Sequence, residues 1–147
     1  MFMKHKYKIG DFYTEEWTPS SHDLHEFSKL SGDLNPIHVD RNIAINLGYK
    51  DVVIHGNLTC AQISRVIGMN FPGNGSVILE QNISFTKPIY TCDKIKFTYT
   101  IISVNEFINV LTIKIKAIKN DLRNKDNYVT VLGGKILCQI LEIPRQF

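Results

Sequence analysis

Residues 58–69 read Leu-Thr-Cys-Ala-Gln-Ile-Ser-Arg-Val-Ile-Gly-Met and predict a helix near the middle of the chain. Its apolar residues fall on most sides of the helix: Leu58, Ala61, Ile63, Val66, Ile67 and Met69. A helix of that composition is buried by other elements rather than laid on a surface. We therefore expect a central helix, and the layer that covers it must come from the rest of the chain.

The chain after residue 75 has the composition of β-strands, because Ile, Val, Thr, Phe and Tyr alternate there with polar residues. Four strands are predicted, at Val77–Phe85, Lys94–Ile102, Ile108–Ile118 and Tyr128–Ile140. Turns are predicted at Lys87-Pro88, at Asn105-Glu106 and over Asn120–Asn127. Inside the last strand, Gly133-Gly134 predicts a bulge or a close backbone contact. The pattern predicts an α+β fold, with one long antiparallel sheet wrapped around the central helix.

A short strand, Asp11–Trp17, is predicted before the helical part of the chain. The next helix can be capped by Ser20 or Ser21, since Asp23 stands in its first turn, where negative charge is favoured. Gly32 ends that helix. The central helix is thus preceded by a helical segment that no strand interrupts.

Residues 33–39 of this segment are predicted to form a loop. Pro36 removes a backbone donor and biases Asn35 towards extended geometry, so the preceding helix cannot continue. Asp40 can cap a second short helix, which Gly48 closes.

A chain of 147 residues predicts a single domain, which we place at residues 1–147. One sheet and one central helix leave a sheet edge and an apolar flank uncovered in a chain of this size. A second copy would cover both, so we expect a homodimer.

The net charge of +3 is too small to indicate a nucleic-acid-binding protein. Five lysines recur with a period close to two in the second half, at Lys94, Lys96, Lys114, Lys116 and Lys119. We interpret them as the solvated face of strands. The alternative is a surface for an anionic partner, such as a phosphorylated cofactor or an acidic carrier protein.

The three cysteines show no metal-ligand spacing and are expected to be reduced thiols. His22 and His25 lack a third ligand at a sensible spacing, so no metal site is predicted. The first residues carry charge without an apolar stretch behind it, and no run is long enough to span a bilayer. We expect a cytoplasmic protein without membrane contact.

Asp33 and His38 stand five residues apart, on either side of the Asn35-Pro36 bend. Either residue alone has an ordinary structural explanation, but both fall in a loop, where catalytic groups concentrate. A carboxylate next to an imidazole can hold one water molecule. One group takes its proton while the other delivers a proton to the neighbouring carbon, and the roles reverse for dehydration. The residues leave open which group does which.

Gly56 stands at the entry to the central helix, where a glycine lets the backbone approach a ligand closely. Free N–H groups at that helix start could stabilise the developing negative charge of a thioester carbonyl. A plain N-terminal turn explains the glycine equally well. Asn57 is a candidate helix cap, and Ser64 could reach the same cavity or, as we favour, bond back to its own helix.

The string Phe27-x-x-Leu-Ser-Gly-Asp-x-Asn-Pro-Ile-His38, followed by Ala44 and His55-Gly56, resembles the MaoC-like dehydratases. That family includes the R-specific enoyl-CoA hydratases and has a hot-dog fold. The likeness extends from about residue 8 onward and includes the Pro-Gly-x-Gly-Ser loop at residues 72–76.

The resemblance implies reversible hydration of trans-2-enoyl thioesters, with Asp33 and His38 as the catalytic dyad and the Gly56 amide on the thioester carbonyl. It places Ser64 near the active site, and we expect Asn35, Asn57 and Ser64 to bind the substrate. It further implies a homodimer, an acyl tunnel along the central helix near the subunit interface, and neither a metal nor a redox cofactor. Because an apolar residue usually follows His-Gly in the family, Asn57 indicates a pocket of different shape or depth.

Other hot-dog proteins fit less well. Thioesterases usually carry a carboxylate on or near the central helix, and residues 58–69 contain no Asp or Glu. Carrier-protein dehydratases of fatty-acid synthesis pair a His-Phe-Pro loop with a helix Glu, whereas Asn70 precedes Phe71-Pro72 here. Two alternatives remain open: a non-catalytic acyl-thioester-binding module, and a dehydratase of this family that acts on acyl chains bound to an acyl carrier protein.

Overall fold

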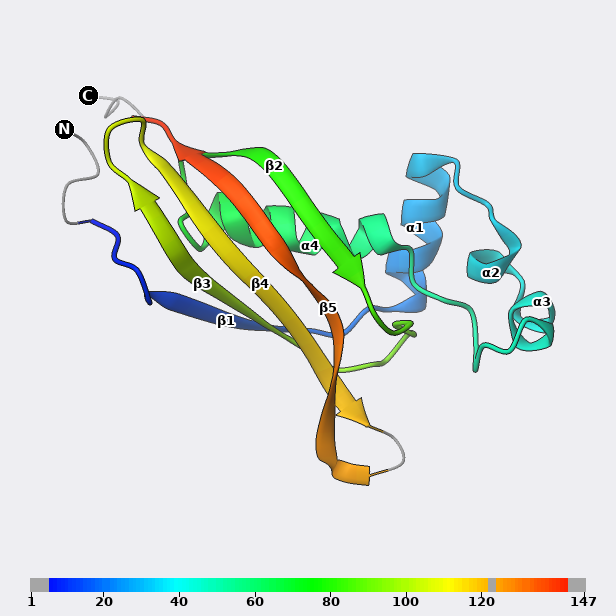
Figure 1. The fold of residues 1–147 in the computed structure, drawn as a ribbon. Coiled ribbons are helices and arrows are strands. Elements are labelled where there is room, and N and C mark those ends of the chain that lie inside the picture. Colours follow the sequence, from blue (N-terminus) through cyan, green and yellow to red (C-terminus); the bar gives the residue numbers. More distant parts are fainter. Residues whose placement is uncertain (1–5, 122–123, 143–147) are drawn as a thin grey trace.

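A computed structural model describes residues 6–121 and 124–142 (Figure 1). In chain order its elements are β1 (Phe12–Trp17), α1 (Ser21–Ser31), α2 (Pro36–Val39), α3 (Arg41–Asn46), α4 (Gly56–Met69), β2 (Ser76–Phe85), β3 (Ile95–Asn105), β4 (Val110–Asp121) and β5 (Asn124–Ile140). The five strands form an antiparallel sheet in the order β1-β3-β4-β5-β2. This α+β arrangement, a curved sheet around one long helix, is the predicted hot-dog fold.

The core lies between α4 and the inner face of the sheet. Alternate residues of the strands point inward, among them Phe97, Tyr99, Ile113 and Ile136, and all four are buried. They pack with Ile63 and other buried residues of α4 in one hydrophobic cluster. Because successive side chains of a strand point to opposite faces of the sheet, every second residue is available to cover the apolar side of α4.

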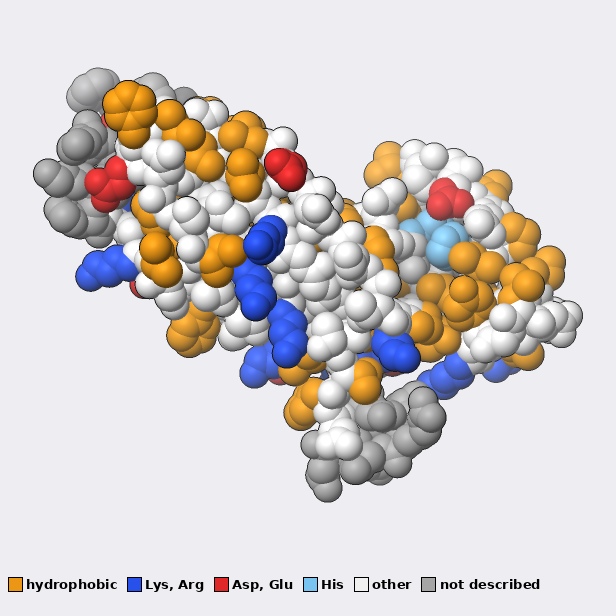
Figure 2. Space-filling view, in the orientation of Figure 1, with side chains coloured by type: hydrophobic (Ala, Val, Ile, Leu, Met, Phe, Trp, Pro, Cys, Tyr) orange, Lys and Arg blue, Asp and Glu red, His pale blue; other side chains and the backbone are white. Residues whose placement is uncertain are grey.

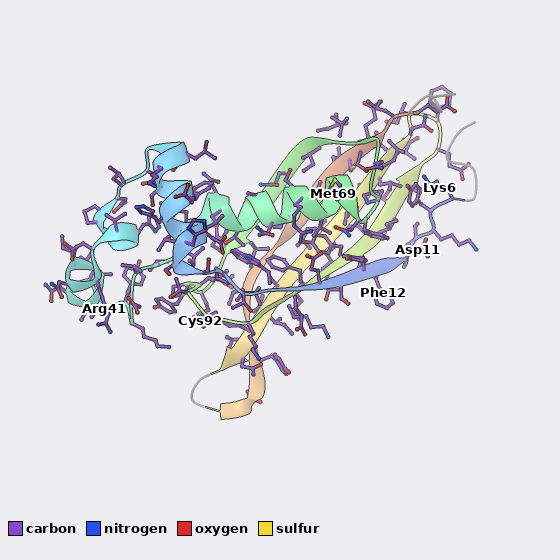
Figure 3. All side chains as sticks on the ribbon, turned by 180° about the vertical axis from the view of Figure 1, so that it is seen from behind. Lys6, Asp11, Phe12, Arg41, Met69 and Cys92 are labelled. Carbon is purple, nitrogen blue, oxygen red and sulfur yellow. The ribbon has the colours of Figure 1, made fainter. Side chains whose placement is uncertain are left out.

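The helix α4 is buried on one side, whereas the sequence predicts burial on most sides. Ala61, Ser64 and Met69 are exposed, because no element among the described residues covers that flank. Met69 lies at the end of the helix away from α3 and its Arg41 (Figure 3). The helices α1, α2 and α3 gather at the other end, beside the start of α4 (Figure 1).

The helix α1 begins with the predicted cap and a complete capping box. Ser20 accepts a hydrogen bond from the Asp23 amide, and its own amide and hydroxyl donate to the Asp23 carboxylate. These hydrogen bonds hold the pKa of Asp23 below its usual value. Gly32 ends the helix in the left-handed conformation, with φ 72°, so both predicted boundaries are confirmed.

The prediction that residues 33–39 form only a loop is wrong for its second half. Pro36–Val39 makes one helical turn, α2. Pro36 is tolerated because the first position of a helix needs no backbone donor. Asn35 caps the turn through its side chain, which accepts from the Ile37 amide. Asp40 caps α3 as predicted, accepting from two amides.

The predicted turn over Asn120–Asn127 is also wrong. β4 runs to Asp121 and β5 begins at Asn124, with these two residues paired. The ladder continues because backbone hydrogen bonding does not require apolar side chains. The resulting β4–β5 hairpin extends beyond the other strands (Figure 1), and the connecting residues 122–123 lie outside the described part of the chain.

Four of the five lysines, Lys94, Lys96, Lys114 and Lys116, are exposed as expected of a solvated face. Lys119 differs. It is largely buried, lies 2.6 Å from the Asp93 carboxylate and donates to the Pro88 carbonyl. It therefore ties the loop after β2 to β4. No helix within the described residues is long and apolar enough to cross a membrane.

Candidate active site

Asp33 follows the end of α1 and is held by its neighbours in the chain. Its amide donates to the Ser31 hydroxyl, and one carboxylate oxygen accepts from the Asn35 amide at 3.1 Å. The side chain is 49% exposed. The carboxylate is thus fixed on one side and open to a ligand or solvent on the other.

His38 stands on α2 and is oriented by the backbone before α4. Its Nδ1 lies 2.6 Å from the Val53 carbonyl oxygen. Because a carbonyl can only accept, Nδ1 carries the proton in this contact. The other nitrogen, Nε2, therefore has a lone pair in the neutral ring, as a proton acceptor requires.

His55, directly before α4, joins the two predicted residues. It is 2% exposed, and its Nε2 lies 3.0 Å from the Asp33 carbonyl oxygen and 3.9 Å from an Asp33 carboxylate oxygen. Its ring stacks on that of His38, with centroids 3.9 Å apart. The sequence pattern marks this histidine only as part of the His55-Gly56 pair and predicts no role for it.

One side-chain atom each of Asp33, His38 and His55 falls within 4.8 Å of the other two. A cluster of this composition could in principle bind a metal ion. However, a metal binds imidazole in the plane of the ring, and the two rings here stack at only 26° to each other. Their lone pairs therefore do not converge, and the arrangement suits proton transfer better than metal binding.

A cavity of about 330 Å³ opens beside His38. Its wall is formed by Gly56 and Thr59 of α4, by residues 85–89 at and after the end of β2, and by apolar side chains that include Val53 and Ile54. Figure 2 shows histidine atoms and an acidic side chain among hydrophobic side chains on this side of the molecule. The cavity has the form of a site for an apolar chain with a few polar groups at one end.

Gly56 is the first residue of α4, so the predicted start at Leu58 is two residues late. His55, not Asn57, is the N-cap, and its side chain makes no capping hydrogen bond. No acceptor for the Gly56 N–H is found within residues 6–121 and 124–142. A Cβ at this position would come within 3.0 Å of the ring of Phe85, which also lines the cavity, so glycine leaves room for that ring beside the start of α4.

The remaining predicted residues are placed elsewhere. Asn35 uses its side-chain oxygen to cap α2. Asn57 and Ser64 are exposed on α4, and neither they nor Asp33 and Asn35 belong to the cavity wall. The cavity wall also contains residues for which the sequence pattern predicts no place in the site, including Thr59, Phe85 and Lys87. Only Thr59 had a usable signal, its place in the first turn of the central helix.

The fold and this cluster of groups define a hot-dog protein of the hydratase and dehydratase kind. The chain belongs to the MaoC-like family: the model of the MaoC like domain matches residues 8–122. The family assignment makes the protein a hydro-lyase.

Similar proteins include the mitochondrial 3-hydroxyacyl-[acyl-carrier-protein] dehydratase of Arabidopsis thaliana, 32% identical over 130 residues, which cover 87% of this chain and 74% of that protein. The (R)-specific enoyl-CoA hydratase of Aeromonas caviae is 31% identical over 80 residues, covering 54% of this chain and 60% of that one. Among solved structures, the (R)-hydratase of A. caviae superimposes with a TM-score of 0.83 at 20% identity, covering 93% of this chain and 99% of that chain. This last likeness concerns the fold.

Proposed function

We propose that the protein catalyses the reversible hydration of trans-2-enoyl thioesters to (R)-3-hydroxyacyl thioesters. The observation that carries the proposal is the proximity of the Asp33 carboxylate and the His38 ring. His38 lies on the wall of an apolar cavity, and Gly56 lies on the same wall. The similarity to an (R)-specific enoyl-CoA hydratase and to 3-hydroxyacyl-[acyl-carrier-protein] dehydratases supports it.

The proposed reaction needs three groups. A water molecule is held between the Asp33 carboxylate and Nε2 of His38. One of the two groups, unprotonated at the start, takes a proton from the water as the water oxygen attacks C3 of the substrate. The other group, protonated at the start, delivers a proton to C2, and a proton passes between the two groups before the next turnover. The Gly56 N–H donates to the thioester oxygen, and the start of α4 stabilises the enolate charge. Because no electrons are gained or lost overall, the reaction requires no redox cofactor.

The proposal is tested with purified protein and crotonyl-CoA. Hydration removes the conjugated double bond, so absorbance of the enoyl thioester should fall with time. The same acyl group on an acyl carrier protein should be assayed in parallel, because similar proteins of both kinds are known. Binding of both thioesters without any conversion would favour the alternative of a non-catalytic acyl-binding module.

We further propose that the protein is a homodimer. β2 is an edge strand whose Val77 and Leu79 are exposed, and Phe85 at its end is 49% exposed. Leu34 and Leu47, near the site, are also exposed, at 64% and 62%. Light scattering should give twice the 16.8 kDa of one chain. A monomer at micromolar concentration would contradict this proposal and leave the exposed edge unexplained.

Gly56→Ala should lower kcat/KM for crotonyl-CoA by roughly ten- to a hundredfold, because the added methyl group would meet the Phe85 ring on the cavity wall and disturb the place where we put the thioester carbonyl. Folding should be retained, since alanine favours a helix and the Phe85 ring can shift. Gly68→Ala is the matched control on the same helix, where a Cβ meets nothing within 4 Å. Equal activity of the two variants would remove Gly56 from the proposed mechanism.

A further inference from the structure

The ring of His55 packs against side chains from two other parts of the helical segment. The Phe27 ring of α1 packs against it with centroids 5.1 Å apart, and the His38 ring of α2 stacks on it at 3.9 Å. His55 itself precedes α4, and only 2% of it is exposed. A side chain packed from several elements has little freedom to rotate, so its polar atoms have defined positions.

Among the described residues, the His55 ring makes one hydrogen bond, and its partner is the backbone of Asp33. Nε2 lies 3.0 Å from the Asp33 carbonyl oxygen, which can only accept, so Nε2 carries the proton. The opposite nitrogen, Nδ1, is buried and has no hydrogen-bond partner among the described residues. The tautomer of His55 is therefore the reverse of that of His38, whose Nδ1 carries the proton.

Among the described residues, Asp33 makes no other hydrogen bond to a residue distant in the sequence. Its other hydrogen bonds are to Ser31 and Asn35, two residues away on either side. Ile37 and His38 are held by hydrogen bonds to Val53. Within the described residues, however, the contact with His55 is the one hydrogen bond that joins Asp33 itself to the start of α4. Without it, only the two local hydrogen bonds would hold the half-exposed carboxylate, so the turn would loosen and the carboxylate could move away from His38.

We propose that His55 is a positioning residue: its Nε2–H holds the Asp33 loop at the distance from His38 at which both groups can share one water molecule. The inference rests on the proposed hydration reaction. It differs from a simple packing role, in which the ring would matter and the hydrogen bond would not.

Two substitutions separate these roles. His55→Phe keeps a ring between Phe27 and His38 but cannot donate to Asp33, whereas His55→Gln keeps a donor near the place of Nε2 but has no ring. We expect His55→Phe to lower kcat by roughly ten- to a hundredfold, with KM changed much less, because a misplacement of about 1 Å can have that effect. His55→Gln should restore kcat to within about fivefold of the original value.

Other outcomes overturn the inference. An unchanged kcat in His55→Phe would show that the hydrogen bond is dispensable, and equal losses in the two variants would assign the effect to ring packing. Thermal unfolding of each variant, measured alongside, shows whether a loss of activity reflects a loss of folded protein.

A second measurement does not depend on activity and so remains decisive if the hydratase proposal fails. Long-range ¹H–¹⁵N spectra of the unsubstituted protein should show the Nε2–H tautomer for His55 and the Nδ1–H tautomer for His38. In His55→Phe, the Asn35 amide, which donates to the Asp33 carboxylate, should exchange with solvent faster. An Nδ1–H tautomer for His55, or unchanged exchange at Asn35, would contradict the proposed positioning.

Discussion

Asp33→Asn and His38→Asn should each lower the rate of crotonyl-CoA hydration by at least about a hundredfold, as general acid and base groups do. Asparagine at position 33 keeps the shape of the side chain and can still accept from the Asn35 amide, but it cannot take a proton. Asparagine at position 38 can still donate to the Val53 carbonyl, as Nδ1 of the histidine does, but it has no basic nitrogen. His38→Ala should lose at least as much activity.

These variants remove charge or basicity while retaining the local hydrogen bonds, so their folding should be nearly unchanged. The side chain of Asp33 is half exposed, and substitutions at such positions usually change stability little. His25→Asn, at an exposed histidine of α1, serves as the control and should keep full activity. Rates equal to the unsubstituted protein in either position-33 or position-38 variant would refute the dyad.

Sequence patterns predict the local structure of this protein well because local rules govern it. Ser20 and Gly32 bound α1 through a capping box and a left-handed glycine, both of which involve neighbouring residues only. The five strands follow from alternation that the inner face of the sheet requires. Errors arise where tertiary pairing extends an element, as at Asp121 and Asn124, which continue the β4–β5 ladder past the core.

The site is less predictable for the same reason. Asp33 and His38 are close in sequence, and their spacing indicates a shared role. The wall of the cavity, in contrast, takes Phe85 and Lys87 from the end of β2 and the residues after it, which no local pattern connects with α2. The His55 contacts likewise depend on how α1, α2 and α4 meet, so the sequence alone offers no basis for its role.

The glycine pair in β5 illustrates how the structure resolves an ambiguity in the sequence. The sequence predicts either a bulge or a close backbone contact at residues 133–134. Both glycines keep a regular register, opposite Ser84 and Ile83 of β2, so there is no bulge at residues 133–134; the register shift in β5 lies at Val131, where it pairs with β4. A Cβ on Gly134 would overlap the Asn82 carbonyl oxygen and would come within 2.9 Å of the Ile83 Cα. Close backbone approach is therefore the reason for glycine at position 134.

Gly134→Ala should lower the free energy of unfolding by at least about 3 kcal/mol, because the overlap is with backbone atoms that cannot rotate away. The unfolding temperature should fall by about 10 °C for a chain of this size. Gly133→Ala is the matched control: its Cβ would lie 4.0 Å from the nearest heavy atom, the Ile115 carbonyl oxygen, and stability should change by less than about 1 kcal/mol. Thermal unfolding followed by circular dichroism measures both.

Since β2 pairs with β5 and ends at Phe85 on the cavity wall, Gly134→Ala should also lower activity below its unfolding temperature. Similar stability in the two variants would mean that β2 can shift away from β5 at little cost, contrary to the close packing of this sheet edge.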